Sequence, residues 1–196
     1  ISTNKSRQTV CQHVRQTWQT IGLPHGVQRD NDAAFCGGYR VKRVFSTLVR
    51  LCVFVGSEPI FIPVREPQRH GVIEQVNGLW SQTFWRRFVF RTVTPVKRAT
   101  PQFAAWYWHH YHPPSLHGQT VAEACRHVQR RRLTKSQVAT LPDDKALPLT
   151  AGRMHCIRLV DEQGDMTLLH ERWHVHKRLA GAYIWAMIVT HEHALR

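Results

Sequence analysis

Carboxylates are scarce in the first 118 residues, and two of them stand where they could bind a metal ion. Only five occur in this part of the chain: Asp30, Asp32, Glu58, Glu66 and Glu74. We expect Asp30 to end a short strand and Glu74 to lie in the first turn of a helix, where the helix dipole favours a negative charge. A strand-end aspartate beside a helix-borne glutamate can hold a hard divalent cation, which prefers carboxylate oxygens and open water positions. The alternative is that both are ordinary solvated acids, and composition alone favours this alternative.

The elements that would position these acids follow from the spacing of the apolar residues. The clearest helix surrounds Glu74, because one of its faces is apolar over about five turns and the opposite face is polar. Gly22 closes the first helix, and Thr120 with Glu123 forms a capping box that starts the last one. In order, we predict a helix at 10–21, a strand at 27–29, a helix at 44–55, a strand at 59–63, and helices at 73–88, 100–111 and 120–132.

The last quarter of the chain has a different pattern. Residues 133–150 lose their periodicity and are typical of a linker. Beyond them the apolar residues alternate with a period of two, in segments separated by glycine-containing turns, at 154–160, 166–169 and 183–189. Short strands with such turns predict a small β-barrel of the SH3 type in residues 151–196.

The charge of the chain predicts an acidic partner. The sequence has 27 Lys and Arg against 13 Asp and Glu, for a net charge of +14, and all of the excess lies before residue 136. Nucleic acid is the commonest acidic partner of such a chain. The five cysteines are scattered and never spaced as C-x-x-C, which disfavours a disulfide framework and a cysteine zinc site. No apolar run approaches the roughly 20 residues that cross a bilayer, so we expect a cytoplasmic protein without a membrane partner.

Three segments resemble one family in the same order. The sequence QRDNDAAF at 28–35 resembles the D-N-G-x-x-F element of insertion-sequence transposases and retroviral-type integrases. The sequence PQRHGVIEQVN at 67–77 is similar to their P-x-x-N-G-x-x-E-x-x-N element, and residues 106–123 are similar to the W-x-x-x-Y-N…H-x-x-L-x-G-x-T-P-x-E segment that follows. Residues 150–196 also resemble the small barrel that follows the catalytic core in one branch of these transposases.

The resemblance implies an α/β fold with the latter part of a ribonuclease H-like integrase core in residues 1–132, then the linker and the SH3-like barrel. It implies a DDE-type transposase that cleaves and joins transposon-end DNA through two Mg²⁺ or Mn²⁺ ions. Asp30 would be the second acid of the Asp-Asp-Glu triad and Glu74 the third, both as metal ligands. The bacterial relatives of this kind act at the nucleoid, and the intact enzyme would be a homo-oligomer.

Three departures from the family pattern shape this prediction. Strict spacing after Asp30 would select Glu66 rather than Glu74, but Glu74 has the His-Gly before it and Asn77 after it. Asp32 stands where the family has glycine. The first Asp belongs to an upstream strand of the core, so we expect this chain to be the C-terminal part of an enzyme and to be inactive by itself.

The predicted DNA contacts are basic and polar residues near Glu74 and before the linker: Arg69, His70, Asn77, Arg86, Arg87, Arg130, Arg131 and Arg132. Two other functions stay open, namely a non-enzymatic DNA-binding remnant held on phosphates and a small RNA-binding protein built on the aromatic-rich helices and the barrel. We expect the histidine-rich segments at 109–112 and 170–176 to form a solvated surface or a DNA-facing patch, because no cysteine pair completes a zinc site.

Overall fold

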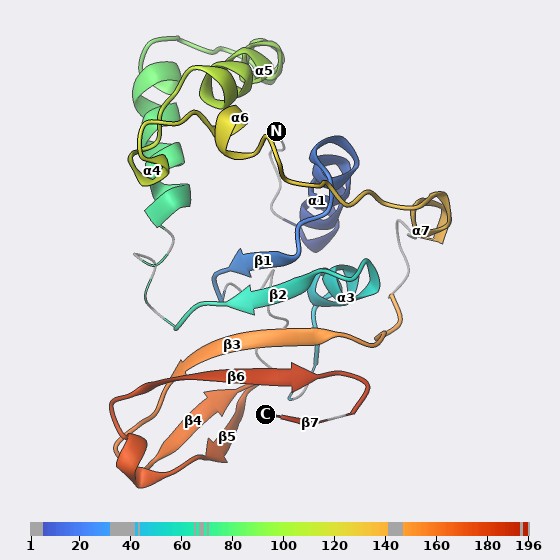
Figure 1. The fold of residues 1–196 in the computed structure, drawn as a ribbon, viewed down its shortest axis with the longest axis vertical. Coiled ribbons are helices and arrows are strands. Elements are labelled where there is room, and N and C mark those ends of the chain that lie inside the picture. The colour runs from blue at the N-terminus through green and yellow to red at the C-terminus, as the bar shows by residue number, and fades with distance from the viewer. Residues whose placement is uncertain are drawn as a thin grey trace. The chain divides into compact units, whose positions relative to one another are not determined.

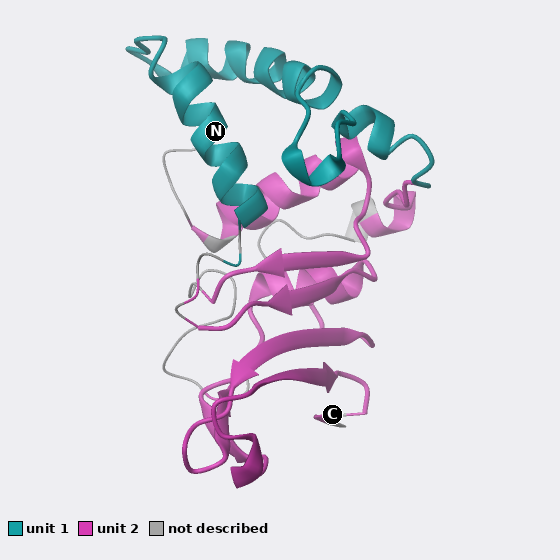
Figure 2. Cartoon of the chain, turned by 60° about the vertical axis from the view of Figure 1, so that its left-hand side comes forward, with its two compact units in different colours: residues 1, 67–129 teal, residues 2–66, 130–196 magenta. Residues whose placement is uncertain are grey.

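The computed structural model describes residues 6–31, 42, 44–64, 66, 69, 71–140, 147–192 and 194–195. The chain divides into two compact units. The helical unit consists of residues 67–129, and the sheet unit combines residues 2–66 with residues 130–196 (Figure 2). The division therefore falls at residues 66 and 130, and the predicted linker at 133–150 lies inside the sheet unit. Within that stretch, α7 (Lys135–Thr140) is helical, and residues 141–146 lie outside the described residues.

The sheet unit is built on a mixed five-stranded sheet (Figure 1). The first three strands are parallel and the last two pair antiparallel. In spatial order the strands are β1 (Gly26–Arg29), β2 (Glu58–Phe61), β3 (Arg153–Leu159), β6 (Tyr183–Val189) and β7 (Ala194–Leu195). The mixed α/β class that the sequence predicts is confirmed.

The strands of the last quarter of the chain form where their alternation predicts, but they do not form a closed barrel in the described part of the chain. Strand β3 pairs in parallel with β2, through Ile60 opposite His155 and Phe61 opposite Cys156. The remaining strands β4 (Asp165–Leu168) and β5 (Glu171–His174) make a separate two-stranded hairpin. The alternation of side chains predicts which faces are buried, whereas the partner of each strand is decided by tertiary packing.

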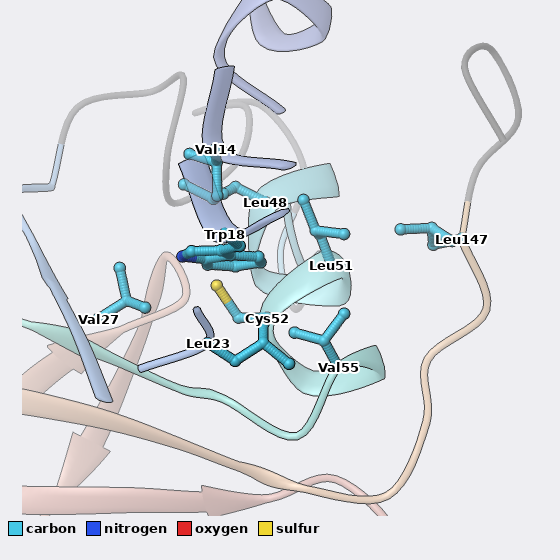
Figure 3. Close-up of a cluster of buried hydrophobic side chains, with 9 residues drawn as sticks. All are labelled: Val14, Trp18, Leu23, Val27, Leu48, Leu51, Cys52, Val55 and Leu147. Carbon is cyan, nitrogen blue, oxygen red and sulfur yellow. The ribbon is translucent and has the colours of Figure 1, made fainter. Parts of the chain in front are cut away.

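Two helices cover one face of the sheet through a cluster of buried side chains (Figure 3). Helix α1 (Arg7–Ile21) begins at Ser6, whose hydroxyl accepts the Thr9 N–H, and ends at Gly22 with a φ of 98°. Helix α3 (Thr47–Phe54) has the same kind of cap at Ser46. The cluster consists of Val14, Trp18, Leu23, Val27, Leu48, Leu51, Cys52, Val55 and Leu147. Burial raises the pKa of the Cys52 thiol to about 12, so this cysteine is a packing residue.

A second cluster joins α3 to the strands that the sequence assigned to a separate domain. Val49 and Val53 of α3 pack on Phe61 of β2 and on Met154 and Cys156 of β3. The β4–β5 hairpin closes this cluster with Met166 and Leu168. Because α3 supplies side chains to both clusters, the N-terminal and C-terminal segments share one core.

A row of side-chain hydrogen bonds, which we call the polar chain, crosses the opposite face of the same sheet. The indole N–H of Trp185 on β6 donates to Nδ1 of His155 on β3 at 2.9 Å. An indole nitrogen can only donate, so Nδ1 accepts and Nε2 of His155 carries the proton. Nε2 therefore donates to Glu58 on β2, at 2.8 Å. The polar chain therefore links the neighbouring strands β2, β3 and β6 through their side chains.

The helical unit contains α4 (Gly71–Trp80), the π-turn η2 (Ser81–Trp85) that continues it, α5 (Val93–His109), the 3₁₀ turn η3 (Pro114–Leu116) and α6 (Val121–Ala124). Helix α5 starts seven residues before the predicted position and runs through Pro101. A proline inside a helix removes one hydrogen bond and costs about 3 kcal/mol. The Thr100 hydroxyl donates to the Val96 carbonyl at 2.7 Å, and Val96 is buried. Thr100 and Pro101 therefore lie inside α5, and the prediction that they start this helix is wrong.

The predicted helix from Thr120 to Arg132 ends early. Its capping box is present, with Glu123 accepting the Thr120 N–H at 2.8 Å. The helix nevertheless stops at Ala124, and Arg131 makes an antiparallel bridge with Leu23. The three arginines therefore do not stand at a helix C-terminus as the sequence predicted.

Candidate nucleic-acid interface

Each of the two predicted catalytic acids lies in the secondary-structure position that the sequence predicts for it. Asp30 directly follows β1, and Glu74 lies in the first turn of α4; both side chains are exposed. They belong to different units, Asp30 to the sheet unit and Glu74 to the helical unit. Their joint metal site therefore stays a prediction. Within the described ranges, no group of three or more His, Cys, Asp and Glu side chains is arranged to hold a metal ion.

Glu66, the alternative third acid, has a structural partner in the sheet unit. The hydroxyl of Tyr183 on β6 donates a hydrogen bond to its carboxylate. Parts of the two motifs lie outside the described residues, namely 32–35, 67, 68 and 70, which include Asp32 and His70.

The strongest feature of the helical unit is a basic segment at residues 85–98, where the chain turns from η2 into α5. Its cations are all exposed, and none forms an ion pair with a carboxylate in the described part of the chain. They are Arg86, Arg87, Arg91, Lys97 and Arg98. We call residues 85–98 the basic turn. Of the predicted DNA contacts, Arg86 and Arg87 lie in it.

The helical unit has few acids to neutralise this turn. Residues 67–129 contain seven Lys and Arg but only the carboxylates Glu74 and Glu123. Glu123 is engaged by Thr120, whose backbone N–H and hydroxyl both donate to it, at 2.8 and 3.0 Å. The backbone hydrogen bond from Thr120 holds the pKa of Glu123 below its usual value, followed by the side-chain hydrogen bond. Within the described part of the chain, no ion pair with a carboxylate neutralises the basic turn.

Stacked rings hold the basic turn in place. Phe90 returns onto Phe84 with ring centres 5.0 Å apart, and Phe84 stacks on Trp80 at 4.2 Å. Phe84 is buried, whereas Trp85 and Phe88 beside it are 45% and 55% exposed. Exposed rings between cations are typical of surfaces that bind single-stranded nucleic acid, because bases stack on them.

The other predicted DNA contacts have mixed surroundings. Asn77 on α4 and Arg69 are exposed. Arg130 and Arg132 are exposed as well. Arg131 supports the sheet unit, because its guanidinium donates to the Val55 carbonyl at 3.1 Å and its carbonyl accepts the Leu23 N–H at 2.7 Å.

A polar network that no sequence pattern predicted holds Asn31, the residue after Asp30. Asn31 donates through Nδ2 to the Ile62 carbonyl at 2.6 Å. Arg158, at the end of β3, donates to the same carbonyl at 3.2 Å and to Oδ1 of Asn31 at 2.9 Å. No local pattern could reveal this network, because Arg158 is 127 residues away from Asn31.

Comparisons with known proteins give no family for the chain. No family model matches it, and no curated protein matches it. No helix in the described ranges is both long and apolar enough to cross a membrane.

Proposed function

We propose that this chain is a DNA-binding part of a DDE-type transposase and that its basic turn binds the DNA backbone. The observation that carries the DNA-binding step is the set of five exposed cations at residues 85–98 that form no ion pair with the described residues. Each such cation that neutralises a phosphate releases a counterion, which drives binding and makes it sensitive to salt. The exposed rings of Trp85 and Phe88 would stack only where bases are unpaired.

The proposed fold assigns β1, α3, β2 and α4 to the latter half of a ribonuclease H-like core. Its support is the parallel β1–α3–β2 unit, with Asp30 directly after β1 and Glu74 in the first turn of the helix that follows β2. The SH3-like part would be the C-terminal strands β3 to β7. The SH3-like assignment has less support than the ribonuclease H-like one. Its strands β3 and β6 belong to the same sheet as β1 and β2, whereas a separate barrel would keep them apart.

The proposed chemistry uses Mg²⁺ or Mn²⁺, and Asp30 and Glu74 have the oxygen donors that these ions prefer. Two bound ions would activate water or a DNA 3′-hydroxyl and stabilise the leaving oxygen. Two carboxylates are fewer than such a centre uses, so the proposal requires a third acid for activity. We expect Asp30→Asn and Glu74→Gln each to abolish cleavage of transposon-end DNA in an assembly that supplies this acid, with binding almost unchanged. Loss of cleavage in Glu66→Gln, with Glu74→Gln still active, would show that Glu66 is the third acid.

The DNA-binding step is tested by reversing two charges in each unit. Arg86→Glu with Arg87→Glu changes the basic turn, and Lys177→Glu with Arg178→Glu is a control of equal charge in the sheet unit. We expect the first pair to weaken binding of a fluorescent duplex about 100-fold and to lower the salt slope by about two. The control should change the affinity less than about threefold. Equal losses in both pairs would show that only net charge matters and would refute a specific basic turn.

A second candidate is a non-enzymatic protein that binds RNA or single-stranded DNA. The exposed Trp85 and Phe88 favour it, since stacking needs unpaired bases. Competition distinguishes the two candidates. A single-stranded RNA that displaces the duplex at lower concentration than unlabelled duplex would favour the second candidate, and the reverse order would favour a transposase fragment.

A further inference from the structure

A cavity in the sheet unit lies where three parallel strands end. Its volume is about 520 Å³, within the range typical of small-molecule sites. Strands β1, β2 and β3 run in the same direction (Figure 1), and residues just beyond or at their carboxyl ends line the cavity: Asn31, Pro63, Val64, Arg158 and Leu159. The carboxyl edge of parallel strands is the usual ligand position in open α/β sheets.

Arg158 supplies the positive charge of this cavity. A guanidinium has five N–H donors. Two hydrogen bonds from Nη1 go to the carbonyls of Ile62 and Ile157, and one from Nη2 goes to Asn31. These bonds fix its plane without neutralising it, because all three acceptors are uncharged. No carboxylate of the described residues lies within ion-pair distance of Arg158.

Three carboxylates line the cavity, and each has a hydrogen-bond partner: Glu66 accepts from the Tyr183 hydroxyl, and Asp161 and Asp165 are held by their own hairpin. Nη2 of Arg172 donates to Asp161 at 3.1 Å and to Asp165 at 2.8 Å. His174 contacts the second oxygen of Asp165 at 2.8 Å, and the other oxygen of Asp161 accepts two backbone N–H groups. The hydrogen bond from the Asp165 N–H is the largest cause of the lowered pKa of Asp161. All four aspartate oxygens therefore have hydrogen-bond partners within the hairpin.

The walls beside Arg158 are apolar. Phe61, Met154, Cys156, Leu159 and Leu169 contribute to them. We propose that the cavity binds a small organic anion, with its carboxylate or phosphate on Arg158 and its apolar body against these walls. A planar guanidinium already held in place pairs with such a group through two N–H donors at little entropic cost. This site lies within the sheet unit, so it is independent of the proposed DNA contact in the helical unit.

The test compares three probes that share an aromatic ring: benzoate, phenyl phosphate and uncharged benzyl alcohol. With the full chain, we expect the two anions to bind at about 1–10 mM or tighter in titrations followed by NMR, and benzyl alcohol at least tenfold more weakly. Arg158→Gln should remove this preference, whereas Lys177→Gln, an exposed cation outside the cavity, should preserve it. Preferential binding of one anion identifies carboxylate or phosphate as the natural group.

A second variant keeps the test decisive if Arg158→Gln does not fold. Thr167 on β4 is exposed and lines the cavity, and Thr167→Trp should fill its mouth without disturbing the buried core. We expect this variant to lose binding of both anions at least tenfold while its unfolding transition is retained. Equal affinity for benzoate and benzyl alcohol, or unchanged anion binding in Thr167→Trp, would overturn the proposal.

Discussion

The two units of this protein differ in how their charged side chains are partnered. In the sheet unit, Arg172 bonds to two aspartates, and Glu58 accepts a hydrogen bond from His155. In the helical unit, the five cations of the basic turn form no ion pair with the described residues. Exposed large rings occur in both units, with Trp85 and Phe88 in the helical unit and Tyr183 and Trp185 in the sheet unit.

This difference assigns different tasks to the two units. Two clusters of buried side chains join α1, α3, the sheet and the β4–β5 hairpin, so the sheet unit has a core of its own. Only Phe84 and Val96 are buried among the large apolar side chains described in the helical unit. A surface with uncompensated charge and exposed rings is available to an anionic partner, as we propose for the basic turn. We therefore expect mutations in the two buried clusters to lower the stability of the sheet unit. Mutations in the basic turn should weaken ligand binding and change stability little.

The largest expected effect is at the shared core. Phe61→Ala should lower the free energy of unfolding by about 3–5 kcal/mol, because it removes a buried ring between α3 and β3. Phe88→Ala, which changes an exposed ring, should cost no more than about 1 kcal/mol. Urea unfolding followed by circular dichroism measures both. Similar losses in the two variants would contradict the contrast between the units.

The next effect concerns stacking. Trp85→Ala should weaken binding of single-stranded DNA by about 1–3 kcal/mol, because one base loses its stacking partner, and should change duplex binding little. Fluorescence anisotropy with matched oligonucleotides measures this difference. Trp185→Ala is the control in the sheet unit, where the ring is also exposed. An equal loss in the control would mean that stacking is not confined to the basic turn.

A smaller effect is expected in the polar chain that crosses the sheet. Trp185→Phe removes the donor to Nδ1 of His155 and leaves a buried acceptor without its partner, which costs about 1–2 kcal/mol. Tyr183→Phe removes an exposed donor to Glu66 and should change stability by about 0.5 kcal/mol or less. Thermal unfolding of both variants checks the prediction, which fails if Tyr183→Phe is the more damaging change.

The smallest effect is at the capping box of α6. Thr120→Ala should cost about 1 kcal/mol, because the first turn loses its cap. Glu123 has a lowered pKa in the folded state, so its contribution is present above its unfolded value of 4.5 and is lost as the pH falls through the folded value. The stability difference between the parent chain and Glu123→Gln should therefore shrink below about pH 4.5. A difference that is constant from pH 7 to pH 3 would rule out this linkage.

Local features of this protein were predictable from its sequence. The strand before Asp30, the helix turn at Glu74, the end of α1 at Gly22 and the capping box at Thr120 all formed as expected. Each of these depends on side chains within a few residues of one another, through capping, turn geometry or side-chain period. The charge distribution is likewise a property of the sequence alone.

The pairing of distant segments was decided only by the tertiary structure. The sequence predicted strands at 154–160 and 183–189 but assigned them to a separate barrel, whereas β3 joins β2 across 90 or more residues. Arg131 and Arg158 acquired their partners in the same way, from carbonyl groups that are close only after the sheet has formed. The physical reason is that alternation specifies a buried face but no neighbour, because backbone hydrogen-bonding groups are the same along every strand.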